Sequence, residues 1–141
     1  KYPFFGPVLG SREPIVVGRS NPREDLVAVL EGGEARLKQG RSVIVFPQST
    51  RSSVFDPAHF NTIGVKLAKR AGVPVIPVAL KTDAWGNGNL LKDFGPVDVK
   101  KTIHFEFGAP MRIEGTGKAE HQQITEFIID RLGVWGREIG E

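Results

Sequence analysis

The chain contains no cysteine, one methionine and one tyrosine, and it has no long hydrophobic run. Without cysteine it cannot form disulfide bonds, use a thiolate in catalysis or bind zinc through sulfur, and this is consistent with a reducing compartment. No window approaches the roughly 18 consecutive apolar residues of a membrane-spanning helix, so none is predicted within this sequence. The three histidines are scattered and give no metal-ligand spacing, so no metal site is expected either.

The composition that remains is that of a globular protein with an uneven charge. At 141 residues, with 40% hydrophobic and 25% charged residues, the chain can form one core. Residues 1–80 hold 11 Lys and Arg against 6 Asp and Glu, a net of +5, whereas residues 81–141 hold 8 against 10, a net of −2. The basic part favours an anionic partner, although a solvated surface explains the charge equally well. Nucleic acid is not expected, because the basic residues are not interleaved with aromatic ones.

Four segments are predicted to be strands. Three of them, Ile15–Arg19, Val43–Phe46 and Val75–Leu80, are near-continuous apolar runs, which is typical of strands buried on both faces of a parallel sheet. The fourth, Ile103–Phe107, alternates between apolar and polar residues. This alternation predicts a half-exposed strand near an edge of the sheet.

Helices are predicted between these strands. Asn21 or Ser20 can cap the first of them, and Gly72 can stop the second. The three predicted helices run from Pro22 to about Gly40, from about Ala58 to Arg70 and from about Ala119 to Leu132.

The alternation of strands and helices predicts the fold class. Strand, helix, strand, helix, strand implies right-handed crossovers, and hence an α/β fold with a mostly parallel sheet. The segment Lys81–Lys101 is predicted to be one long loop, and loops of that length are often functional. No repeat or linker divides the chain, so residues 1–141 are treated as part of one domain.

The segment Phe46–Ser52, Phe-Pro-Gln-Ser-Thr-Arg-Ser, carries the clearest chemical signal. It follows a predicted strand, and ligands of open α/β sheets bind beyond the carboxyl ends of strands. Arg51 offers a rigid fork that binds phosphate or carboxylate through two parallel hydrogen bonds, and the neighbouring hydroxyl groups add donors. The segment is therefore predicted to be an anion-binding turn.

Three blocks in the chain resemble one family of enzymes. The segment above is similar to the Phe-Pro-Glu-Gly-Thr-Arg-Ser block of the 1-acyl-glycerol-3-phosphate acyltransferases. The run Val73–Val78 looks like the Val-Pro-x-x-Pro-Val strand that follows it in that family, and Ile15–Asn21 looks like an apolar strand that ends in Arg. The resemblance covers most of residues 1–80.

The resemblance implies a substrate-binding site for the phosphate of a lysophospholipid acceptor. Arg51 should hold that phosphate, and Arg19, at the end of its own strand, could converge on it. The chain departs from the family at Gln48 and Ser49, where the family has Glu and Gly, and at Asn61, where it often has Lys. The substrate-binding residues that the resemblance implies are Arg19, Gln48, Ser49, Thr50, Arg51 and Ser52.

No catalytic residue is expected within this chain. The family uses a His with an Asp five positions later, in which the His removes a proton from the acceptor hydroxyl and the Asp orients the imidazole. The positions five residues after the three histidines are Gly64, Ala109 and Glu126, so the motif is absent. In the family that motif precedes the strand that ends at Arg19. We therefore expect an N-terminally truncated, C-terminal portion of a longer acyltransferase domain, inactive by itself.

The expected function of the whole enzyme is acyl transfer in phospholipid biosynthesis. By resemblance, an acyl chain moves from acyl-CoA or acyl-carrier protein to 1-acyl-glycerol-3-phosphate, and no cofactor is needed because the thioester is already activated. The resemblance also implies a membrane surface as a partner and a location at the cytoplasmic face of the membrane. A non-catalytic α/β module that binds an anion or a lipid phosphate is the alternative, because the His-Asp motif is missing.

Overall fold

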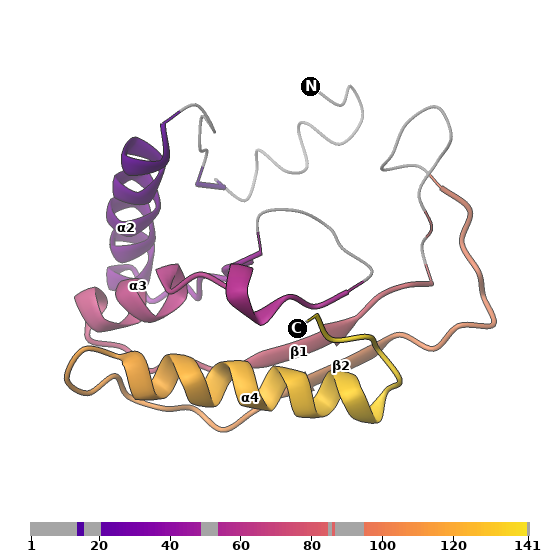
Figure 1. Ribbon diagram of the computed structural model, residues 1–141. Helices are drawn as coiled ribbons and strands as arrows, with labels where there is room; N and C mark the ends of the chain where they lie inside the picture. The colour runs from indigo at the N-terminus through magenta and orange to yellow at the C-terminus, as the bar shows by residue number, and fades with distance from the viewer. Residues whose placement is uncertain (1–13, 16–20, 49–53, 85, 87–94, 141) are drawn as a thin grey trace. The chain divides into compact units, whose positions relative to one another are not determined.

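The computed structural model describes residues 14–15, 21–48, 54–84, 86 and 95–140 (Figure 1). The chain divides into two compact units, Lys1–Val45 and Phe46–Glu141, and each is described by itself.

The first unit contains helix α2, Pro22–Lys38. The Asn21 side chain accepts a hydrogen bond from the backbone N–H of Arg23 at 3.1 Å and donates one to Glu24 at 2.8 Å. Asn21 is thus the N-cap, and the predicted helix is confirmed. Ile15 lies close to Gly32, whose missing side chain leaves room for it. The helix ends at Lys38, just before Gly40, which has a positive φ of 75°.

The predicted strand Val43–Phe46 is wrong for this structure. The segment is irregular, and Ile44 and Phe46 are 79% and 75% exposed. A strand is stable only with a neighbour to which it can hydrogen-bond, and no strand of the described residues pairs with this one. Of the predicted strand Ile15–Arg19 only Ile15 is described, and it lies in no strand.

The second unit contains a two-stranded antiparallel sheet of β1, Val78–Lys81, and β2, His104–Phe107. Val78 lies opposite Phe107, and an isolated antiparallel bridge between Val75 and Met111 continues the pairing. The predicted mostly parallel sheet is therefore not found in the described residues. A parallel pair needs a crossover connection, usually a helix, and the described parts of the segment between β1 and β2 contain no helix.

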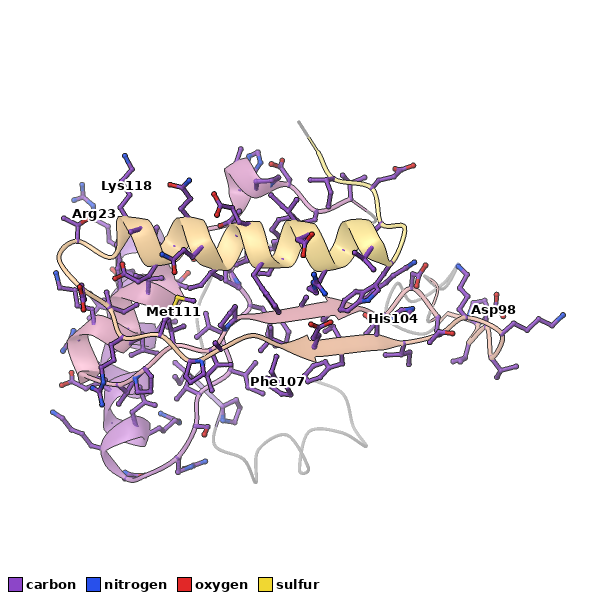
Figure 2. The ribbon with its side chains drawn as sticks, turned by 90° about the horizontal axis from the view of Figure 1, so that it is seen from below. Arg23, Asp98, His104, Phe107, Met111 and Lys118 are labelled. Carbon is purple, nitrogen blue, oxygen red and sulfur yellow. The ribbon has the colours of Figure 1, made fainter. Side chains whose placement is uncertain are left out.

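Helix α4, Lys118–Val134, packs on one face of this sheet (Figure 2). It extends the predicted helix by a residue or two at each end. Its residues Ile124, Ile128 and Leu132, spaced at one turn, are buried together with Phe55 and Val65. This cluster is the core of the second unit.

The predicted helix Ala58–Arg70 is split in two. A short 3-10 helix, η1, spans Pro57–His59, and helix α3 spans Ile63–Ala71. Asp56 and Asn61 each accept a hydrogen bond from the backbone N–H two residues further on, at 2.9 and 3.0 Å, so each starts a helical segment of its own. Gly72 ends α3 in the left-handed conformation, with φ 66°, as predicted.

The two faces of the sheet differ in polarity, and the exposed face is the apolar one. The face toward α4 carries Ala79, which is fully buried, and two polar residues: Glu106 lies 3.6 Å from Arg131 of α4, and the ring of His104 stacks on Trp135, which directly follows α4, with centroids 5.0 Å apart. The opposite face is apolar and exposed, and Figure 2 shows Phe107 on the side of β2 away from α4. Ile103–Phe107 is half-exposed as predicted, but its exposed half is the aromatic one.

The turn before α4 depends on Gly117, and this dependence can be tested. Gly117 has φ 79°, and a Cβ there would lie 2.5 Å from Cγ1 of Val65. Gly115 has φ 51° and nothing within 4 Å of such a Cβ. We expect Gly115→Ala to lower the free energy of unfolding by about 1 kcal/mol through backbone strain. Gly117→Ala should cost about 2–4 kcal/mol, because overpacking adds to that strain.

Urea unfolding of both variants measures the difference. Equal losses for Gly115→Ala and Gly117→Ala would contradict the close packing of the turn against α3.

Candidate anion-binding site

The structure describes one of the predicted substrate-binding residues, Gln48, which is half-buried. The other five, Arg19, Ser49, Thr50, Arg51 and Ser52, lie outside the described residues. Their predicted convergence on a phosphate therefore stays a prediction. The residues on either side of the segment are described, and they show how it is held.

Asn61 holds the entrance of the segment. Its Nδ2 donates a hydrogen bond to the backbone carbonyl of Pro47 at 2.5 Å, while its Oδ1 accepts one from the backbone N–H of Ile63 at 3.0 Å. Pro47 immediately precedes Gln48, so the same side chain starts α3 and fixes the beginning of the predicted anion-binding turn. Sequence comparison had marked Asn61 only as the place where a family cation is missing.

Phe60 and Phe55 anchor this arrangement in the core. The ring of Phe60 packs edge-on against Phe55, with centroids 5.5 Å apart, and stacks on His121 of α4 at 5.6 Å. Phe55 is buried, and its backbone pairs with residues 138–140 through hydrogen bonds of 3.1 Å and 2.7 Å. Phe55, the second described residue after the segment, is thus fixed, as Pro47 is at its start.

Just beyond the segment, Asp56 and His59 form a pair that the sequence search missed. Nδ1 of His59 lies 2.6 Å from Oδ2 of Asp56, and the Asp56 carboxylate also caps η1. The family motif has an Asp that follows a His, whereas in this pair the Asp precedes the His by three residues. The His59 side chain is 80% exposed. The geometry therefore describes a helix cap with a surface ion pair.

This pair lowers the pKa of Asp56. The hydrogen bond from His59 holds the pKa of the carboxyl below its ordinary value of 3.8, desolvation opposes this, and the N–H of Ala58 assists it. A carboxylate with a depressed pKa stabilises the folded state above its unfolded pKa, and that stability is lost as the pH falls through the folded pKa.

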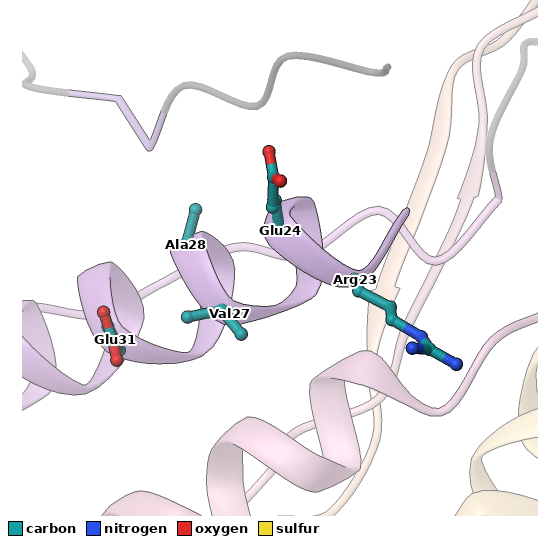
Figure 3. Close-up of a pocket in the computed structure, with 5 residues that line it drawn as sticks. All are labelled: Arg23, Glu24, Val27, Ala28 and Glu31. Carbon is teal, nitrogen blue, oxygen red and sulfur yellow. The ribbon is translucent and has the colours of Figure 1, made fainter. Parts of the chain in front are cut away.

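Neither of two hollows in the described part of the chain suits a lipid substrate. One, of about 360 Å³, is lined by five side chains that all belong to α2 (Figure 3), so the described residues give it no facing wall. The other, of about 120 Å³, lies between α3 and residues 112–113, below the size of ordinary ligand pockets. Lys69 at its rim donates a hydrogen bond to the carbonyl of Gly115.

No group of three or more His, Asp or Glu residues among the described residues could hold a metal ion. No helix among them is long and apolar enough to cross a membrane.

Comparisons with known proteins assign the chain to a family. A family model described as Acyltransferase matches residues 1–81. A 1-acyl-sn-glycerol-3-phosphate acyltransferase from Pseudomonas aeruginosa is 35% identical over 115 residues, which cover 82% of this chain and 43% of that protein. Proteins of the same name from Cocos nucifera and Limnanthes alba are each 29% identical over 101 residues, or 70% of this chain and 33% and 36% of theirs. No solved structure matches.

The chain belongs to the acyltransferase family. Within it, the relatives place the chain with the 1-acylglycerol-3-phosphate acyltransferases, and the resemblance drawn from the three sequence blocks is confirmed. The chain spans less than half the length of these curated relatives.

The Asp56–His59 pair leads to a prediction about acid stability. Asp56→Asn keeps an acceptor for the N–H of Ala58 but cannot titrate. Above about pH 4, the melting temperature of this variant should therefore be lower than that of the wild type. The difference should shrink as the pH falls through the depressed pKa of Asp56. Thermal melts between about pH 2.5 and 6 measure it.

Asp98→Asn is the matched control. Asp98 accepts a hydrogen bond from the backbone N–H of Lys100 at 3.0 Å in a similar turn, and it has no ion pair with a histidine in the described part of the chain. A pH dependence as large as that of Asp56→Asn would contradict the role of His59.

Proposed function

We propose that this chain supplies the acceptor-phosphate site of an acyltransferase in phospholipid biosynthesis. The acceptor is 1-acyl-glycerol-3-phosphate, and the donor is acyl-CoA or acyl-carrier protein. The observation that carries the proposal is the sequence Pro-Gln-Ser-Thr-Arg-Ser at residues 47–52 in a chain of this family. The names of the relatives support the acceptor, and the basic charge of residues 1–80 supports a phosphate or an anionic membrane surface as a partner.

The reaction joins the free hydroxyl of the acceptor to the acyl carbonyl of the thioester. The C–O bond forms, the C–S bond breaks, and a general base takes the proton of the hydroxyl and passes it to the leaving thiolate. In this proposal Arg51 and Arg19 bind the phosphate, and Gln48, Ser49, Thr50 and Ser52 add hydrogen bonds. Gln48 keeps the acceptor oxygen of the family Glu without its charge, so it suits a hydrogen-bonding role rather than that of a base.

Residues 1–141 alone should not transfer acyl groups. The chain lacks a His followed by an Asp at the family spacing, and the one His–Asp pair of the described residues is an exposed cap. Incubation of the purified chain with lysophosphatidate and an acyl thioester should give no phosphatidate above the background. Acylation that disappears in His59→Gln would overturn this and make His59 the base.

The second candidate is a non-catalytic module that binds a lipid phosphate. The two candidates differ in the full-length protein, which is active in the first and inactive in the second, whereas both bind the acceptor.

In the full-length protein that carries this chain, Arg51→Ala should raise the KM for lysophosphatidate by about 10- to 100-fold, since a charge-assisted bidentate contact contributes about 1.5–3 kcal/mol. Arg51→Lys should recover only part of this, because Lys has the charge without the planar fork. Steady-state kinetics with the acceptor varied at saturating donor measure both variants. If Arg51→Lys equals the wild type, the bidentate role is wrong.

A further inference from the structure

Asn61 lies outside the predicted binding residues, yet it makes both of the described side-chain contacts at the entrance of the segment. We propose that Asn61 is a positioning residue of the acceptor site: it ties the carbonyl of Pro47, and with it Gln48 and the start of the anion-binding segment, to the first turn of α3. The inference rests on the proposed function, since it concerns how that phosphate site is held.

The two contacts require an amide side chain. The carbonyl of Pro47 can only accept, and the backbone N–H of Ile63 can only donate, so their common partner must offer one donor and one acceptor. Asn61 provides both, and its two partners also fix the orientation of the amide. Asp or Ser at this position would keep an acceptor for Ile63, but neither would hold Pro47: Asp lacks the donor, and Ser lacks the reach.

The hydrogen bond from Asn61 can position Pro47 only if Asn61 is itself held in place, and the structure shows that it is. Asn61 directly follows Phe60, which packs between Phe55 of the core and His121 of α4. The packing of the second unit therefore fixes the position of Asn61, and the hydrogen bond from Asn61 in turn restrains Pro47. The segment begins at this held carbonyl, and the chain beyond its last residue, Ser52, is held at Phe55, which is paired to residues 138–140.

This arrangement also explains what the chain does at a place where the family often has a cation. A Lys there could add charge, whereas Asn61 adds none and makes two hydrogen bonds to the backbone. In this chain the residue therefore acts on the phosphate indirectly, through the geometry of the turn. Phosphate recognition depends on such geometry, because a bidentate guanidinium contact is directional.

The test compares Asn61→Asp and Asn61→Ser in the full-length protein. Both keep an acceptor for the N–H of Ile63, so the melting temperature should stay close to that of the wild type. Both lose the bond to Pro47, and the KM for lysophosphatidate should rise about three- to tenfold, which is the range of one hydrogen bond. The KM for the acyl donor should not change, and kcat should stay within about twofold.

Thr62→Asp is the matched control for charge. It places a carboxylate one residue further on, at the N-cap of α3, where the Thr62 side chain makes no capping hydrogen bond, and it leaves Asn61 intact. It should keep the wild-type KM for the acceptor. If Thr62→Asp raises that KM as much as Asn61→Asp does, the effect is one of charge and the tether is wrong.

The remaining outcomes separate this inference from the proposed function. A wild-type protein that fails to acylate lysophosphatidate contradicts the proposed function, whatever the variants do. An active wild type whose acceptor KM is unchanged in both Asn61 variants contradicts the tether alone. Asn61→Ser decides the matter if Asn61→Asp fails to fold, since Ser is a favourable residue at the start of a helix.

Discussion

The burial of Phe55 against the apolar stripe of α4 is the contact on which the second unit depends. Its ring lies in the core with Val65 of α3 and Ile128 of α4, and its backbone pairs with the residues that follow α4. Burying a side chain of this size stabilises a fold by about 1.5–3 kcal/mol. One residue thus joins α3, α4 and the C-terminal segment. The predicted anion-binding segment ends at Ser52, three residues before Phe55, so the candidate site lies next to the core of the second unit along the chain.

A consequence is that both flanks of the segment are fixed by different kinds of interaction. At its exit, apolar packing and backbone pairing hold Phe55. At its entrance, the side chain of Asn61 holds the carbonyl of Pro47 through one hydrogen bond on the surface. Such a bond contributes only about 0.5–1.5 kcal/mol, so the entrance is the more adjustable end. Substitutions there should change how a ligand is held before they change whether the protein folds.

The sequence predicted best what depends on local interactions. Asn21 and Gly72 mark the ends of α2 and α3 because capping involves residues only a few positions apart. The split of the helix at Phe60 was missed, because the side chains of Asp56 and Asn61 each bind a backbone N–H two residues further on, and these two local turns override helical spacing. The predictions of a strand at Val43–Phe46 and of a parallel sheet depended on pairing partners far along the chain, which periodicity cannot identify. At the candidate site, the family pattern named the residues expected to bind, but fixed spacings could not identify Asn61 or the reversed Asp56–His59 pair.

The account is tested most directly by the dependence of acyl transfer on the acceptor phosphate. The full-length protein should be assayed with lysophosphatidate and with monoacylglycerol, which has the same acyl chain and a free hydroxyl but no phosphate, at equal concentrations and with one acyl thioester. The account predicts that kcat/KM for lysophosphatidate exceeds that for monoacylglycerol by at least about 100-fold, the equivalent of about 2.7 kcal/mol of binding to the phosphate. Equal values for the two acceptors would show that the segment Pro47–Ser52 does not bind the phosphate, and would contradict the central claim.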